Sequence, residues 1–147
     1  MAPAARSAIV RRTLPAAPAR VYAEWTDPDA LADWMCPRPA RCLSVSLEPH
    51  VGGAVRFEIE EDGVAFSVWG RFLALEPPRL IRFTWSCSTW PDPGVESVVT
   101  VALEEVGHGE TAMTIEHSGL PTGLAHRHES GWATIAGQLA SELTANA

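Results

Sequence analysis

Four polar side chains are of the types that could bind or transform a small molecule, namely Tyr22, Glu58, Arg71 and His128. Arg71 and Glu58 lie on neighbouring strand-like segments, where the arginine could pair with the glutamate or with an anionic ligand group. His128 lies on the apolar stripe of a helical segment, where an imidazole could hydrogen-bond a ligand or act as a general base. The structural alternatives are a surface ion pair on the outer face of the sheet and a histidine bonded to a strand backbone.

The tryptophans point to a lined pocket, because six in 147 residues are many and aromatic side chains supply much of the lining of small-molecule sites. Trp34, Met35 and Trp90 are predicted to form a gate, with the alternative that Trp90 packs on its own Pro-rich loop or at a subunit interface. Several strands carry apolar residues on both faces, so part of the predicted lining must point outward. The predicted ligand-binding residues are Trp34, Met35, Phe57, Phe66, Trp69, Arg71, Phe83, Trp85, Met113, His128 and Trp132.

Other site chemistries find little support in the sequence. His117, His126 and His128 have no carboxylate at a ligand-like spacing, so no metal is expected. There is no Gly-x-Ser-x-Gly elbow and no Gly-rich phosphate loop, so catalytic residues stay unknown and no cofactor is expected. Cys36, Cys42 and Cys87 are odd in number and irregularly spaced, which favours three reduced thiols.

The elements that must position these residues can be read from hydrophobic periodicity. His128, Trp132, Ile135, Leu139 and Leu143 recur on one face of a long helix within residues 121–147. Asp27 is a good N-cap and Pro28 a good first residue for the second of two short helices, predicted over 18–25 and 29–34. Strands are predicted over residues 8–14, 42–49, 54–60, 64–75, 80–86, 95–105 and 111–117. The predicted order is therefore one strand, two helices, six strands and one long helix.

Charge and composition limit the partners. The formal net charge is −7 and the sequence pI is about 5.1, which argues against nucleic acid and against anionic membrane surfaces. No apolar run approaches the roughly 20 residues of a membrane span, and the first residues lack the apolar region of a signal peptide. We therefore expect a cytoplasmic protein with one domain over residues 1–147, in which residues 1–7 form a flexible tail.

The ordered set of these motifs resembles the START-like (Bet v 1-like) superfamily, also called SRPBCC, and within it the single-domain bacterial AHSA1-like relatives of the Hsp90 ATPase activator. The resemblance implies an α+β helix-grip fold, in which a curved, seven-stranded antiparallel sheet wraps around the C-terminal helix. Gly52, Gly53 and Gly70 stand where a curved sheet would bend, and Gly131 is expected to let the helix approach the sheet closely. The matching residues are Pro18, Val21, Thr26-Asp27-Pro28, Leu31, Trp34, Val51-Gly52-Gly53, Gly70, Pro77-Pro78-Arg79-Leu80, Thr84-Trp85, His128, Gly131-Trp132 and Leu139.

The resemblance implies several functions, because the superfamily includes carriers, aromatase/cyclases and chaperone regulators. Our leading expectation is a protein that binds a small hydrophobic or aromatic molecule between the sheet and the last helix, without turnover. One alternative is an aromatase/cyclase-like enzyme, which requires at least two of Tyr22, Glu58, Arg71 and His128 to converge in the cavity. Another is a protein-interaction module, although the chaperone activator carries a further N-terminal domain that this sequence lacks, so no chaperone partner is expected. Edge strands that need cover favour a homodimer.

Overall fold

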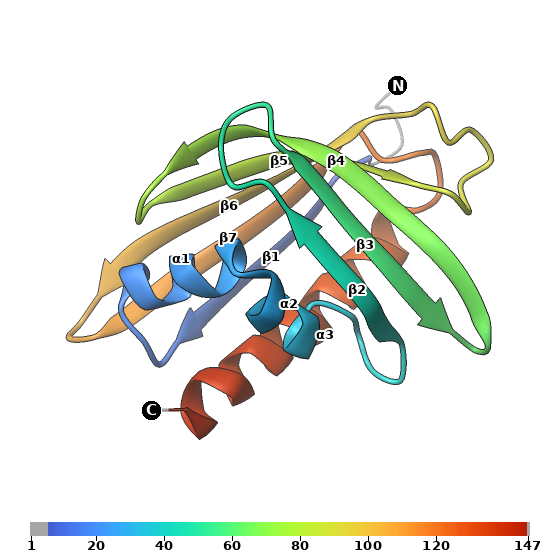
Figure 1. The fold of residues 1–147 in the computed structure, drawn as a ribbon. Helices are drawn as coiled ribbons and strands as arrows, with labels where there is room; N and C mark the ends of the chain where they lie inside the picture. Colours follow the sequence, from blue (N-terminus) through green and yellow to red (C-terminus); the bar gives the residue numbers. More distant parts are fainter. Residues whose placement is uncertain (1–5, 147) are drawn as a thin grey trace.

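A computed structural model describes residues 6–146 and contains the predicted order of elements (Figure 1). Two short helices follow the first strand, and the long helix α3 comes last. The predicted α+β helix-grip fold is therefore confirmed. The elements are β1 (Ala8–Leu14), α1 (Pro18–Thr26), α2 (Pro28–Trp34), β2 (Arg41–Leu47), β3 (Ala54–Glu61), β4 (Val64–Glu76), β5 (Leu80–Cys87), β6 (Ser97–Val106), β7 (Glu110–Ser118) and α3 (Ala125–Ala145).

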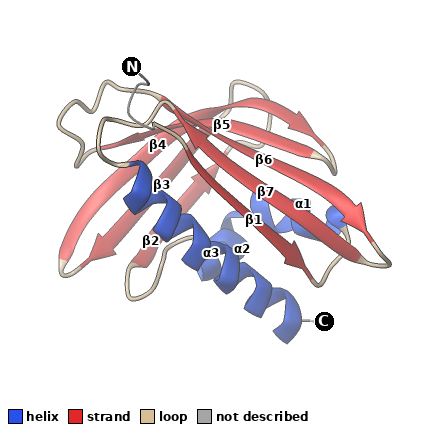
Figure 2. Cartoon of the chain, turned by 180° about the vertical axis from the view of Figure 1, so that it is seen from behind, coloured by secondary structure: helices blue, strands red, loops and turns tan. Residues whose placement is uncertain are grey.

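The seven strands form one antiparallel sheet in the order β1-β7-β6-β5-β4-β3-β2. β1 and β2 are consecutive in the chain but lie at opposite edges, so α1 and α2 must cross the open end of the sheet to connect them. α3 lies across the concave side and packs against β1 and α2 (Figure 2). The bent sheet and the three helices together enclose the core.

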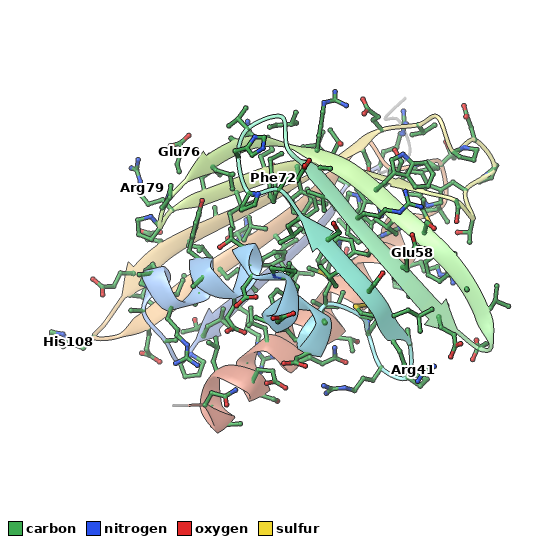
Figure 3. All side chains as sticks on the ribbon, viewed as in Figure 1. Arg41, Glu58, Phe72, Glu76, Arg79 and His108 are labelled. Carbon is green, nitrogen blue, oxygen red and sulfur yellow. A yellow bond between two sulfur atoms is a disulfide. The ribbon has the colours of Figure 1, made fainter. Side chains whose placement is uncertain are left out.

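Alternation along the strands decides which side chains enter that core. On β3, Val55, Phe57 and Ile59 are buried on the concave side, whereas Arg56 and Glu58 point outward. The hairpin tips carry polar side chains away from the core: His108 lies between β6 and β7, Glu76 ends β4, and Arg79 lies in the turn before β5 (Figure 3).

Two glycines allow strands to approach closely where the sheet bends. A side chain at Gly70 on β4 would overlap the backbone carbonyl of Thr84 on β5, and one at Gly53 would overlap the carbonyl of Glu48. The pairing of β4 with β5 also shifts by one residue between Phe72 and Ala74. A bulge of this kind bends a strand and increases its twist, which is what a sheet wrapping a helix requires.

The N-cap prediction for α2 is confirmed. The Asp27 carboxylate accepts hydrogen bonds from the backbone N–H groups of Asp29 at 2.9 Å and Ala30 at 3.5 Å, and Pro28 opens the helix. Several strand boundaries differ from the prediction by one or two residues, and β6 begins at Ser97 rather than at residue 95. The Val95 N–H instead closes a turn by donating to the Asp92 carbonyl at 3.2 Å.

Two further predictions need correction. Cys36 and Cys42 form a disulfide with a Cα–Cα distance of 5.9 Å, while Cys87 is a buried free thiol. The prediction of three reduced thiols was therefore wrong. The loop after α2 folds back onto β2 and brings the two cysteines within disulfide range.

Residues 1–5 of the expected tail lie outside the described residues. Arg6 is anchored, because its Nε donates to the Leu120 carbonyl at 2.7 Å and its own carbonyl accepts the Leu120 N–H at 3.0 Å.

Within residues 6–146, no helix has the length and apolar character needed to cross a bilayer.

We expect Gly70→Ala to lower the free energy of unfolding by about 1–3 kcal/mol, because the added methyl group must displace the Thr84 carbonyl. Gly137→Ala is the matched control. Its Cβ would meet only the Nη1 atom of Arg12 at 3.7 Å, so the gain in helix propensity should raise the stability by up to about 1 kcal/mol. Urea denaturation measures both values. Equal stability of Gly70→Ala and the wild type would contradict the close strand approach.

Candidate functional site

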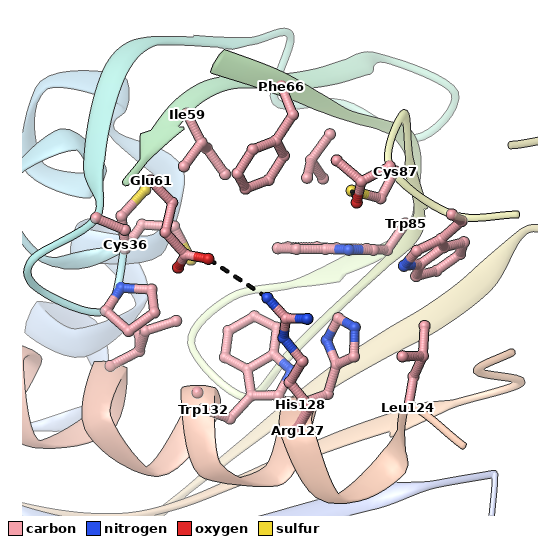
Figure 4. Close-up of a pocket in the computed structure, with 18 of the residues that line it drawn as sticks. Cys36, Ile59, Glu61, Phe66, Trp85, Cys87, Leu124, Arg127, His128 and Trp132 are labelled. Atoms are coloured by element: carbon pink, nitrogen blue, oxygen red, sulfur yellow. Dashed lines mark hydrogen bonds and ion pairs between the residues drawn. The ribbon is translucent and has the colours of Figure 1, made fainter. Parts of the chain in front are cut away.

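A cavity of about 230 Å³ lies between α3 and the strands β3, β4 and β5. Apolar and aromatic side chains make up most of its wall, and a few polar groups lie among them (Figure 4). The lining residues are Met35, Cys36, Pro37, Ala40, Ile59, Glu61, Phe66, Val68, Trp85, Cys87, Thr89, Trp90, Pro91, Leu124, Arg127, His128, Gly131, Trp132 and Ile135.

One face of α3 forms the floor of this cavity. Leu124, immediately before the helix, and His128, Gly131, Trp132 and Ile135 follow at spacings of three or four residues, which places them on the same side. Figure 4 shows the His128 and Trp132 side chains rising from the helix toward the space below Ile59 and Phe66. The predicted helix stripe therefore faces both the core and the cavity.

Gly131 opens the cavity instead of tightening the contact between helix and sheet. A Cβ atom at this position would meet no heavy atom of residues 6–146 within 4 Å, apart from its chain neighbours and the helix backbone. The expected close approach at Gly131 was therefore wrong. A glycine inside a helix costs about 1 kcal/mol relative to alanine, and here the missing side chain leaves open space in the cavity.

A buried hydrogen-bond relay fastens the floor of the cavity to the sheet. The indole Nε1–H of Trp132 donates to Nδ1 of His117 at 3.0 Å. Nε2 of His117 lies 2.7 Å from the Ser97 hydroxyl, which donates its own proton to the Trp85 carbonyl at 2.7 Å. The Ser97 oxygen must therefore accept the His117 Nε2–H, so the ring is neutral and its tautomer is fixed. Burial, followed by repulsion from His128, lowers the pKa of His117 to about 3.

His128 faces the cavity without a hydrogen-bond partner among residues 6–146. Its ring packs edge-on against the rings of His117 and Trp90, with centroid separations of 5.0 Å and 6.0 Å, and neither ring nitrogen takes part in a hydrogen bond within residues 6–146. Both nitrogens of His117 are already committed to Trp132 and Ser97. Burial, with a smaller contribution from Arg127, lowers the pKa of His128 to about 4. The imidazole is therefore neutral at pH 7 and available to a bound molecule.

An ion pair spans the edge of the cavity. Nη2 of Arg127 on α3 lies 3.4 Å from Oε1 of Glu61 at the end of β3 (Figure 4). The Arg127 side chain is 78% exposed, so the ion pair is weak in water. It therefore offers little resistance to opening of the cavity at this edge.

Gln138 on α3 fixes the loop after α2, which forms another part of the cavity wall. Its Nε2 donates to the carbonyls of Trp34 at 2.9 Å and Cys36 at 2.8 Å, and its Oε1 accepts the backbone N–H of Arg38 at 2.9 Å. These bonds fix the loop that supplies Cys36 and Pro37 to the lining.

The structure divides the predicted ligand-binding residues into three groups. Met35, Phe66, Trp85, His128 and Trp132 line the cavity, where contact with a ligand stays a prediction. Trp34 and Met113 lie buried in the core, and Phe57 and Phe83 border a separate void of about 10 Å³, which is too small for a ligand. Trp69 and Arg71 lie on the outer face, so their expected place in the lining was wrong.

The polar pair expected from Glu58 and Arg71 does not form. Arg71 bonds Glu96 at 2.6 Å, and Glu58 bonds Arg56 at 2.7 Å, both on the outer face of the sheet. The Ser67 hydroxyl and then Arg56 lower the pKa of Glu58, which is the behaviour of a carboxylate in a surface ion pair. Both residues alternate with the buried positions of their strands and therefore point away from the cavity. Tyr22 is half-buried on α1 and lies outside the lining.

Two of the three residues predicted to form a gate line the cavity, and their action as a gate stays a prediction. Met35 and Trp90 line the cavity, and Trp90 is 6% exposed even though it lies in a Pro-rich loop. Trp34 instead packs on Trp25 with a centroid separation of 4.9 Å.

Among residues 6–146, no group of three His, Cys, Asp or Glu side chains could hold a metal ion.

Sequence reasoning missed Glu61, Arg127 and Gln138. Glu61 and Arg127 look like ordinary surface charges in the sequence, and nothing local shows that Gln138 will meet a loop 100 residues earlier. The spacing of Leu124, His128 and Ile135 on one helix face was a usable signal for the cavity floor.

Comparison with known proteins agrees with this architecture. The family described as Activator of Hsp90 ATPase homolog 1-like protein matches residues 15–144. None of the curated proteins matches the sequence. Protein CV1439 from Chromobacterium violaceum is 30% identical with a TM-score of 0.85, and the match covers 94% of this chain and 96% of that one.

Two further solved structures share the fold. The AHSA1 (SPO3351) protein from Silicibacter pomeroyi is 24% identical with a TM-score of 0.80, and the match covers 96% of this chain and 99% of that one. DynU16, a protein of the dynemicin biosynthetic locus, is 24% identical with a TM-score of 0.75, and the match covers 95% of this chain and 48% of that one.

The buried His117 predicts a pH-dependent stability. The unfolded chain takes up a proton near pH 6.5, whereas folded His117 does so only near pH 3, so stability is full above about pH 6.5 and falls as the pH drops between these values. The slope from this residue is about 1.4 kcal/mol per pH unit. Urea denaturation of the wild type and of His117→Gln between pH 7 and 4 should give a shallower slope for the variant. His108→Gln, at an exposed hairpin tip, is the control, and a wild-type slope in His117→Gln would refute the assignment.

Proposed function

Because this chain belongs to the Activator of Hsp90 ATPase homolog 1-like family, we propose that it binds a small apolar or aromatic molecule in the cavity between the sheet and α3. The observation that carries the proposal is the cavity itself, which is walled by Phe66, Trp85, Trp90 and Trp132 and contains one unpartnered imidazole. Concave, mostly apolar sites with a few placed polar groups are typical of small-molecule binding.

The size of the cavity supports a small ligand. A cavity of about 150 Å³ in an engineered protein accommodates benzene, and the present 230 Å³ allows one or two aromatic rings. The volume is below the roughly 300–1,000 Å³ of pockets that hold drug-sized molecules.

The geometry does not support catalysis by the four polar residues that the sequence suggested. An aromatase/cyclase-like reaction requires at least two of Tyr22, Glu58, Arg71 and His128 inside the cavity, and only His128 lines it. DynU16 belongs to a biosynthetic locus, and its likeness to this chain concerns the fold. We therefore propose binding rather than catalysis.

A protein-interaction role is also less well supported, because the exposed aromatic patch that it would need around Trp90 is absent from the described surface. Trp90 is 6% exposed, and its ring packs edge-on against that of His128. The homodimer expected from the edge strands stays a prediction.

The absent side chain at Gly131 offers a direct test. Gly131→Leu should fill the cavity from the helix side and weaken the binding of naphthalene at least tenfold, as measured by isothermal titration calorimetry. Ala133→Leu adds a similar group at an exposed position of the same helix and should leave binding unchanged. Equal naphthalene affinity for the wild type and Gly131→Leu, or no binding to the wild type, would reject the cavity as the site.

A further inference from the structure

We propose that the ligand is a neutral aromatic molecule of one or two rings whose hydroxyl group hydrogen-bonds His128. This inference rests on the proposed function, because it names the chemical class that the same cavity accepts. It follows from the charges at the cavity, from the hydrogen-bonding state of each polar side chain in its wall, and from the fixed position of the His128 ring.

The charges of the lining cancel. Glu61 and Arg127 face each other at 3.4 Å at the edge of the cavity and leave no net charge there. His128 is neutral at pH 7, because burial lowers the pKa of its imidazole to about 4. His117, below the floor, is neutral as well. An ionic ligand would thus lose its hydration without meeting an unpaired opposite charge, which disfavours it strongly.

Besides Trp85, two polar side chains of the wall have no hydrogen-bond partner among the described residues: the His128 imidazole and the Trp90 indole, whose N–H can only donate. Glu61 and Arg127 bond each other, and the Thr89 hydroxyl lies 3.1 Å from the Cys87 thiol. The indole Nε1–H of Trp132 is committed to His117. The Nε1 atom of Trp85 has no partner in residues 6–146, but it is buried out of reach of a molecule in the cavity. A polar ligand group therefore finds its best available contact at the imidazole.

The position of the imidazole is fixed from two sides. The rings of Trp90 and His117 pack edge-on against it, which restricts its rotation. His117 cannot bond it, because both His117 nitrogens are occupied. A neutral imidazole presents one donor and one acceptor nitrogen, and a hydroxyl group can serve either one. A phenol-type group therefore pairs with His128 whichever nitrogen carries the proton.

The walls select the rest of the ligand. Phe66, Trp85 and Trp132 surround the space near His128 from the sheet and from the helix (Figure 4). Aromatic faces and edges of this kind favour a planar aromatic partner over a flexible chain.

The test compares three probes that share one ring system and differ in a single group: naphthalene, 2-naphthol and 2-naphthoate. Isothermal titration calorimetry at pH 7 gives their affinities for the wild type. One hydrogen bond contributes about 0.5–1.5 kcal/mol, so 2-naphthol should bind about 2- to 12-fold more tightly than naphthalene. 2-Naphthoate should bind more weakly than 2-naphthol.

Variants of the helix assign this preference to one side chain. His128→Phe should reduce the ratio of naphthol to naphthalene affinity to about one, and His128→Gln, which keeps hydrogen-bonding capacity, should restore part of it. His126→Phe makes the same change at an exposed position two residues away and should keep the wild-type ratio.

The outcomes separate this inference from the proposal on which it rests. Equal binding of naphthalene and 2-naphthol, with both lost in Gly131→Leu, would overturn the hydroxyl preference and leave the cavity proposal standing. Tightest binding of 2-naphthoate, or an unchanged ratio in His128→Phe, would likewise overturn the inference. Failure of all three probes to bind the wild type would overturn both.

Discussion

Trp132 is the point at which the long helix is fastened to the sheet. Its indole N–H begins a relay through His117 and Ser97 to the Trp85 carbonyl, so one residue of α3 is bonded to β7 and, through it, to β6 and β5. The helix also packs against β1. These contacts draw α3 toward one half of the sheet, and the space between the helix and β3 and β4 stays open as the cavity. The asymmetric attachment of the helix thus explains why a binding site exists.

The aromatic cluster makes this attachment rigid. Trp132 packs on Trp25 and Trp85 with centroid separations of 6.2 Å and 5.4 Å, and Trp25 packs on Trp34. Trp25, Trp34 and Trp85 bury indole N–H groups that find no acceptor within residues 6–146, so their value lies in buried area and shape. Trp132 alone of these four adds a directed hydrogen bond. A cavity that stays open without a ligand needs stiff walls, and this cluster supplies one of them.

The elements of the fold could be predicted because their signals are local, but the face of each strand could not be read from composition. β4 carries Phe66 and Phe72 on one face and Trp69 and Leu73 on the other, so both faces looked suitable for a pocket. The missing step was register: the two-residue turn Asp62-Gly63 pairs Glu61 with Val64, which sets Trp69 opposite Arg56 on the charged outer face. No local sequence pattern predicts the contacts between separate segments. These are the hydrogen bonds of Gln138, the Cys36–Cys42 disulfide and the His117 relay.

The central claim is that a small aromatic molecule lies between α3 and the sheet. Nuclear Overhauser contacts between unlabelled 2-naphthol and the isotope-labelled protein test it most directly. The account predicts contacts from the naphthol protons to Phe66, Trp132 and Ile135 in the cavity wall. Contacts to Trp69 and Leu73 on the outer face, or none to the cavity residues at saturating 2-naphthol, would contradict it.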